Sequence, residues 1–180
     1  MVKLLIADDE SFTRQGILET IPWKALNISE VREAYDGQNA LEIIKDFEPD
    51  ILLTDVRMPR LNGIELSFKV RELYPNCSII FMSGFSDKEY LKSAIHLKAI
   101  SYVEKPIDLD ELEISIRNAV TEAQKSKIIY KNIKDNRKLS MRYNVLSREQ
   151  LKALSEDSSK ADGAANTDSL IEYKHFQNRF

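Results

Sequence analysis

Cysteine and histidine are scarce in this chain, and long apolar runs are absent. Cys77 is the single cysteine among 180 residues, which excludes a disulfide framework and a cysteine-rich metal site. No apolar run approaches the roughly 18 residues that suggest a membrane span, and the first residues lack a secretory pattern. The two histidines, His96 and His175, are not clustered, so they do not indicate a zinc site. His96 lies on the predicted fourth helix without a partner motif and His175 lies in the tail, so surface or packing roles are favoured over a phosphorelay. We expect a cytoplasmic protein with no membrane partner.

Charge is unevenly distributed and predicts two parts. Residues 1–124 hold 14 Lys or Arg against 22 Asp or Glu, a net of −8, whereas residues 125–180 hold 12 against 7, a net of +5. We expect a globular domain over 1–124 and a helical extension and linker over 125–180. Lys125–Asn136 is compatible with continuation of a preceding helix, Ser147–Gln150 resembles a capping box that opens a short helix, and Ser158–Ser169 resembles a flexible linker.

Five short apolar runs alternate with amphipathic segments in the first part. The predicted strands are 3–7, 28–34, 51–54, 78–82 and 100–103. The intervening segments repeat apolar residues at helical spacing, and Asp108 is predicted to cap the last helix. Strand–helix units at such short spacing predict a doubly wound α/β domain, a parallel sheet with helices on both faces.

Polar side chains follow four of the predicted strands. Asp8-Asp9 comes after the first strand, Asp55 after the third, Ser83 after the fourth and Lys105-Pro106 after the fifth. Taken singly, each also fits an ordinary cap, loop or turn. Because the carboxyl ends of parallel strands converge at one edge of the sheet, we expect these groups to share one pocket.

The chemistry of that pocket points to phosphoryl transfer. Three carboxylates, Asp8, Asp9 and Asp55, would raise the pKa of at least one of them, since like charges disfavour joint ionisation. An oxygen-rich, partly solvated site of this kind suits Mg²⁺. Lys105 adds a positive charge and Ser83 a hydroxyl donor, which together suit an anion added to Asp55. Asp55 is therefore the predicted nucleophile for a phosphoryl group.

These motifs together resemble the receiver domain of two-component response regulators. The segments that carry the resemblance are Ala7-Asp8-Asp9-Glu10, Asp55-Val56-Arg57-Met58-Pro59, Asn62-Gly63, Ser83-Gly84 and Tyr102-Val103-Glu104-Lys105-Pro106. The resemblance implies a flavodoxin-like sheet in the order 2-1-3-4-5. It also implies a signalling domain, not an enzyme beyond its own phosphorylation and dephosphorylation.

The resemblance assigns a role to each residue of the pocket. Asp55 would accept a phosphoryl group from a sensor histidine kinase. Asp9 and Asp55 would bind Mg²⁺ directly, Asp8 would assist, and the Arg57 carbonyl would complete the metal shell. Lys105 would pair with the phosphoryl group.

Two further features are implied in the same way. The Lys105-Pro106 peptide bond would be cis. Ser83 and Tyr102 would form the switch pair, in which the hydroxyl moves toward the phosphoryl group and the ring turns inward, so that phosphorylation shifts a pre-existing equilibrium.

Details of the first part are similar to receivers fused to AraC-type DNA-binding domains. They include Thr13-Arg14-Gln15-Gly16-Ile17, Ile21-Pro22-Trp23 and Ser83-Gly84-Phe85-Ser86-Asp87. Phe85 cannot orient a hydrolytic water as a carboxylate or amide would, which predicts a long-lived acyl phosphate.

Three hypotheses about function follow from these observations. An AraC-type output would need on the order of 100 residues by family resemblance, and only about 55 follow Gln124. The chain is then a receiver and linker whose DNA-binding part lies elsewhere, or a stand-alone receiver acting through protein contacts. A haloacid-dehalogenase-type hydrolase needs an Asp-x-Asp after the first strand, which Asp8-Asp9-Glu10 does not supply. A homodimer through the fourth helix, fifth strand and fifth helix is also predicted, with an extension along Val120, Ala123, Tyr130 and Ile133.

Overall fold

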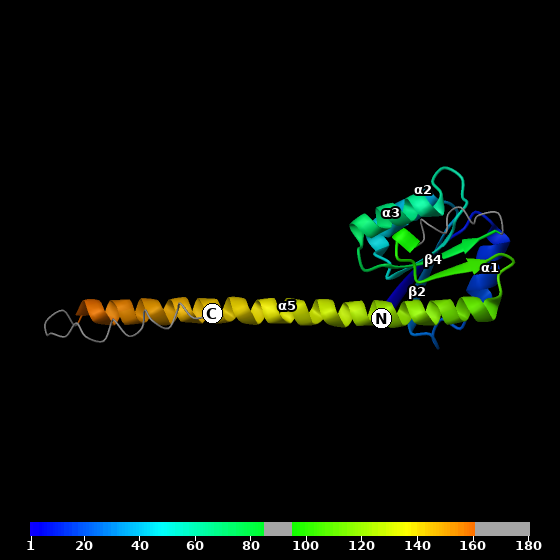
Figure 1. Ribbon diagram of the computed structural model, residues 1–180. Coiled ribbons are helices and arrows are strands. Elements are labelled where there is room, and N and C mark those ends of the chain that lie inside the picture. Colours follow the sequence, from blue (N-terminus) through cyan, green and yellow to red (C-terminus); the bar gives the residue numbers. More distant parts are fainter. Residues whose placement is uncertain (85–94, 161–180) are drawn as a thin grey trace. The chain divides into compact units, whose positions relative to one another are not determined.

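The core of the protein is a parallel sheet of five strands in the order β2-β1-β3-β4-β5, as predicted. A computed structural model describes residues 1–84 and 95–160, with side chains described up to residue 138 (Figure 1). The strands are β1 (Val2–Ala7), β2 (Ile28–Ala34), β3 (Ile51–Asp55), β4 (Ser78–Ser83) and β5 (Ser101–Glu104). The three central strands are buried almost throughout, whereas β2 lies at an edge and is mostly exposed.

Helices cover both faces of the sheet (Figure 1). They are α1 (Ser11–Thr20), α2 (Gly37–Phe47), α3 (Gly63–Leu73) and α5 (Leu109–Lys160). On one face, Ile17 of α1 and Ile116 of α5 pack against alternate residues of β1, β3 and β4. On the other face, Ile44 of α2 and Leu66 of α3 pack against Leu5 of β1 and its neighbours. The fourth predicted helix lies mostly outside the described residues.

The first two strands end where predicted, but β3, β4 and β5 each end one residue later, and this difference concerns the functional edge. Asp55 pairs with Met82 and is the last residue of β3, while Ser83 pairs with Glu104 and is the last residue of β4. Backbone pairing does not depend on the polarity of the side chain, so the ladder continues through both polar residues. Their side chains are therefore fixed by sheet geometry and not by a loop.

Side chains close the amino ends of three helices. Asp36 accepts a hydrogen bond from the Asn39 amide at the start of α2. Asn62 and Glu65 form a reciprocal capping box at the start of α3. Asp108 accepts hydrogen bonds from the amides of the first turn of α5, as predicted. Each such cap satisfies amides that the helix leaves without partners, typically worth about 1 kcal/mol.

The helix α5 is longer than the sequence suggested. The prediction of a new helix opening at Ser147–Gln150 is wrong, because α5 continues unbroken from Leu109 to Lys160. No Gly or Pro interrupts this span, and good helix formers such as Leu151 and Ala153 follow the supposed cap. Of the predicted linker 158–169, the first three residues are helical and the rest lie outside the described residues.

The chain divides into two compact units, Met1–Tyr130 and Lys131–Phe180. The functional boundary near Gln124 stays a prediction. In the part of the chain that the structure describes, no helix combines the length and the apolar character needed to cross a membrane.

Candidate functional site

Three carboxylates meet at the carboxyl edge of the sheet. One carboxylate oxygen from each of Asp8, Asp9 and Asp55 lies within 4.8 Å of the others. Asp8 follows β1 and Asp55 ends the adjacent β3, and both are buried, whereas Asp9 is exposed. The sequence predicted this meeting because the carboxyl ends of parallel strands converge at one edge of a sheet. Hard oxygen ligands with one solvent-exposed member fit Mg²⁺, which keeps several waters when bound.

Lys105 joins this cluster from the end of β5. Its ammonium group pairs with Asp55, lies 3.0 Å from Asp8 Oδ2 and lies 3.5 Å from Glu10 Oε2. The predicted cis peptide bond between Lys105 and Pro106 is present. Glu10 was not predicted to contact Lys105, although it follows the Asp pair directly.

Burial dominates the electrostatics of the two buried carboxylates. It raises the pKa of Asp8 and of Asp55 above their usual range, and the hydrogen bonds from Lys105 counteract it only in part. Repulsion between carboxylates contributes less than burial does, so the predicted shift is present but its main cause is desolvation. Burial also disfavours the charged form of Lys105, yet its bonds to Asp55 and Asp8 outweigh that effect and raise its pKa. A cation stabilises the ionised form of this cluster.

The backbone around Asp55 is closely packed. The Arg57 amide donates to Asp55 Oδ1 at 3.0 Å, and the Thr54 hydroxyl donates to the Asp55 carbonyl at 3.0 Å. A Cβ atom at Gly63 would stand 1.9 Å from that same carbonyl oxygen, so only glycine fits there. Asn62-Gly63 is among the segments that carry the resemblance, but the close approach of Gly63 to Asp55 was not foreseen.

Ser83 and Tyr102, the predicted switch pair, lie on the neighbouring strands β4 and β5. Ser83 is fully buried, and its hydroxyl has no hydrogen-bond partner among the described residues. Tyr102 is half-buried and packs against a small cluster that includes Val56 and Phe81. Phe85 and His175 lie outside the described residues. His96 is exposed, with its ring centroid 6.3 Å from that of Phe68, and is not part of the site.

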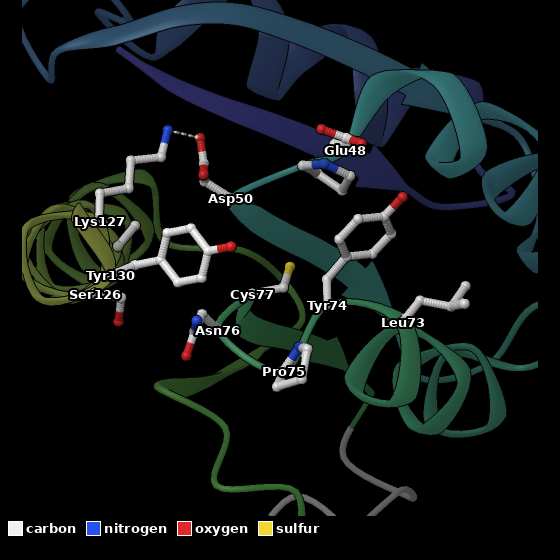
Figure 2. A pocket seen from close by; sticks show the side chains of 12 residues that line it. Glu48, Asp50, Leu73, Tyr74, Pro75, Asn76, Cys77, Ser126, Lys127 and Tyr130 are labelled. Atoms are coloured by element: carbon white, nitrogen blue, oxygen red, sulfur yellow. Dashed lines mark hydrogen bonds and ion pairs between the residues drawn. The ribbon is translucent and has the colours of Figure 1, made fainter. Parts of the chain in front are cut away.

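A second hollow, of about 500 Å³, lies at the amino edge of the sheet. Figure 2 shows Tyr74 and Tyr130 around it, with Cys77 between them and the Lys127–Asp50 ion pair at one side. Asp50 and Cys77 directly precede β3 and β4, so this hollow lies at the opposite strand ends from Asp55. It holds none of the predicted site residues.

Comparison with known proteins identifies the family of this chain. The family described as "Response regulator receiver domain" matches residues 4–117, which include Asp8, Asp9, Asp55, Ser83 and Lys105. This chain belongs to that family. It is a receiver domain of the kind found in two-component systems.

Curated relatives extend beyond the receiver. An uncharacterized response regulatory protein of Staphylococcus epidermidis is 39% identical over 113 residues, which cover 63% of this chain and 44% of that protein. The transcriptional regulatory protein HptR of Staphylococcus aureus is 36% identical over 120 residues, covering 67% of this chain and 47% of HptR. The matched receiver thus spans about half the length of these relatives.

Two solved structures are matched over nearly their whole length. A two-component transcriptional regulator AraC from Clostridium phytofermentans is 49% identical, with a TM-score of 0.67, and the match covers 71% of this chain and 98% of the Clostridium chain. The receiver domain of AraT, a response regulator from Geobacillus stearothermophilus, is 37% identical, with a TM-score of 0.66, and the match covers 71% of this chain and 99% of the AraT chain.

Proposed function

We propose that this receiver accepts a phosphoryl group on Asp55 from a sensor histidine kinase. The observation that carries the proposal is the convergence of Asp55, Asp8, Asp9 and Lys105 at one sheet edge, with all three carboxylates within 4.8 Å and Lys105 paired to two of them. A buried carboxylate flanked by a cation and by a set of metal-binding oxygens is equipped to attack phosphorus. Catalysis is limited to the chain's own phosphorylation and dephosphorylation.

The transfer needs little covalent chemistry from the protein. A carboxylate oxygen of Asp55 would form the new bond to phosphorus while the bond from phosphorus to the donor's imidazole nitrogen breaks and that imidazole keeps the electron pair. Lys105, now paired with Asp55 and Asp8, would turn its charge to the phosphoryl oxygens. The unpartnered hydroxyl of Ser83 would donate to one of them, with Tyr102 following as the second half of the switch.

The acidic cluster fits Mg²⁺, and its donors would divide the work. Asp9 and Asp55 would hold the ion directly, Asp8 would assist, and the Arg57 carbonyl would complete the shell. The exposed Asp9 leaves a side open to water, as Mg²⁺ prefers. When bound, the ion would supply positive charge to the transferring phosphoryl oxygens.

We infer that the output is control of transcription through a DNA-binding domain outside this sequence. Two named relatives support this: HptR is called a transcriptional regulatory protein, and the Clostridium chain a two-component transcriptional regulator AraC. A homodimer through the fourth helix, β5 and α5 would connect phosphorylation to that output. The alternative is a stand-alone receiver that acts through protein contacts, and the length of the encoded chain beyond Phe180 separates the two.

Intact-mass measurement tests the acceptor. The protein is incubated with Mg²⁺ and acetyl phosphate beside Asp55→Asn, which keeps the shape of the side chain and removes the nucleophile. We expect one phosphoryl group on the wild type and none on the variant. Equal modification of both would place the acceptor elsewhere, and no modification of the wild type would make the domain a phosphorylation-independent module. With Phe85 in place, the acyl phosphate should persist, and loss within seconds would contradict that expectation.

A further inference from the structure

The loop of residues 56–62 connects Asp55 to α3 and passes the start of α2. Near its middle, Arg60 has a φ of 68°, a left-handed conformation that is disfavoured for Arg. A residue stays in such a conformation only when its surroundings hold it. The contacts that hold Arg60 lie on the segment 35–37, which leads into α2.

An ion pair joins Arg60 to Asp36. Asp36 is fully buried, with one oxygen accepting from the Asn39 amide at 2.7 Å and the other, Oδ2, being the atom that pairs with Arg60. A buried carboxylate is stable only when its charge is paired, and Arg60 supplies that charge. The Arg60 guanidinium also lies 5.6 Å from the centroid of the Tyr35 ring, a second favourable contact with the same segment.

Two glycines, Gly37 and Gly63, allow close backbone contacts at the end of this loop. A Cβ atom at Gly37 would stand 2.1 Å from the Leu61 carbonyl oxygen, next to Arg60. A Cβ atom at Gly63 would stand 1.9 Å from the Asp55 carbonyl oxygen. Earlier in the loop, the Arg57 amide donates to Asp55 Oδ1. The loop thus contacts the segment 35–37 through Arg60 and Leu61, and it contacts Asp55 through Arg57.

We propose that Arg60 is a positioning residue, which through its pairing with Asp36 holds the 56–62 loop so that Arg57 stays against Asp55 and the cation site keeps its shape. The inference rests on the proposed function, because the cation concerned is the proposed Mg²⁺. Among the described residues, Arg60 contacts Asp36 and Tyr35 and makes no contact with the carboxylate cluster. Its effect passes through the loop backbone.

Simple electrostatics predicts the opposite effect, which makes the proposal testable. Arg60 carries a positive charge, so Coulomb's law alone requires that its removal leave Mg²⁺ binding unchanged or tighter. Loss of positioning requires that binding weaken. Mutation of a residue that orients a metal ligand typically lowers the metal affinity by about 10- to 100-fold. Because the Arg60 side chain is exposed, we expect a loss near the lower end of this range.

The experiment measures Mg²⁺ binding by calorimetry on the wild type, Arg60→Ala and Arg60→Lys. Arg32→Ala is the matched control, since Arg32 pairs with Glu30 on the exposed edge strand. We expect Arg60→Ala to weaken binding about tenfold, Arg60→Lys to restore part of it, and Arg32→Ala to leave it unchanged. A metal-free readout accompanies this: hydrogen exchange of the Arg57 amide should accelerate in Arg60→Ala.

Unchanged or tighter binding with unchanged Arg57 exchange in Arg60→Ala would overturn the proposal. If the wild type itself binds no Mg²⁺, the proposed function fails, while the exchange measurement still decides whether Arg60 holds the loop. If Arg60→Ala does not fold because Asp36 is left unpaired, Asp36→Asn/Arg60→Ala replaces it. Asn is an equally good helix cap, so this double variant removes the ion pair between Arg60 and Asp36 without leaving a buried charge. We expect it to weaken Mg²⁺ binding as much as Arg60→Ala does.

Discussion

At the scale of single residues, we expect the Ser83 hydroxyl to contribute to phosphorylation and not to stability. Its buried hydroxyl has no partner among the described residues, so Ser83→Ala should leave the free energy of unfolding unchanged or raise it slightly. Ser115 is the matched control, because its buried hydroxyl lies 2.8 Å from that of Ser101, and Ser115→Ala should cost about 1 kcal/mol.

Urea denaturation measures both Ser variants, and intact mass after acetyl phosphate treatment measures phosphorylation. Ser83→Ala should accumulate acyl phosphate more slowly, whereas Ser115→Ala should react as the wild type does. A Ser83→Ala variant that is destabilised as much as Ser115→Ala would show that Ser83 has a structural partner.

Cys77 offers a prediction about pH. Burial raises the pKa of its thiol from 9.0 to about 12, so the folded protein keeps this proton over a range in which the unfolded chain loses it. Ionisation therefore favours the unfolded chain as pH rises from 9 to 12, and the contribution of Cys77 to stability falls over that window. At pH 8, iodoacetamide should label only unfolded molecules, and labelling should follow the urea transition. Rapid labelling in native buffer would contradict the burial of this thiol.

At the scale of elements, the start of α3 can lie against the end of β3 because Gly63 has no side chain. Gly63→Ala would force Cβ against the Asp55 carbonyl, and we expect a loss of about 1–3 kcal/mol in unfolding free energy, together with weaker phosphorylation. Gly16 in α1 is the control, since nothing lies within 4 Å of its position for Cβ. Gly16→Ala should stabilise the helix by about 0.5–1 kcal/mol. Similar losses in both variants would mean that the contact at Gly63 does not set its cost.

Sheet order explains which parts of the site were predictable. Asp8, Asp55 and Lys105 could be placed together because parallel strands bring their carboxyl ends to one edge, a rule that needs only strand assignment. The contact of Gly63 with Asp55 and the pairing of Arg60 with Asp36 could not be predicted, since each depends on the path that the loop between β3 and α3 takes. The Ser147 cap was misleading because a local motif opens a helix only where the preceding helix has ended. The metal-ligand and switch roles remain predictions.

At the scale of the whole molecule, Met1–Tyr130 forms a compact unit. We expect a fragment of residues 1–130 to fold alone, since it contains all the strands of the described sheet and the Lys127–Asp50 ion pair. Its thermal midpoint should lie within a few degrees of that of the full chain, because a difference of 1 kcal/mol shifts such a midpoint by roughly 4–8 °C in a small domain. Circular dichroism against temperature measures this, and a much lower midpoint would show that residues beyond Tyr130 support the fold.

The ammonium group of Lys127 also donates to the Met1 carbonyl at 2.6 Å, while it pairs with Asp50. The first residue of the receiver and this turn of α5 are therefore neighbours in space. A fluorescent protein or purification tag fused ahead of Met1 would crowd α5 at Lys127, at the strand ends opposite Asp55. Such a fusion is a poor choice for measuring the unmodified protein, for which the label belongs elsewhere on the chain.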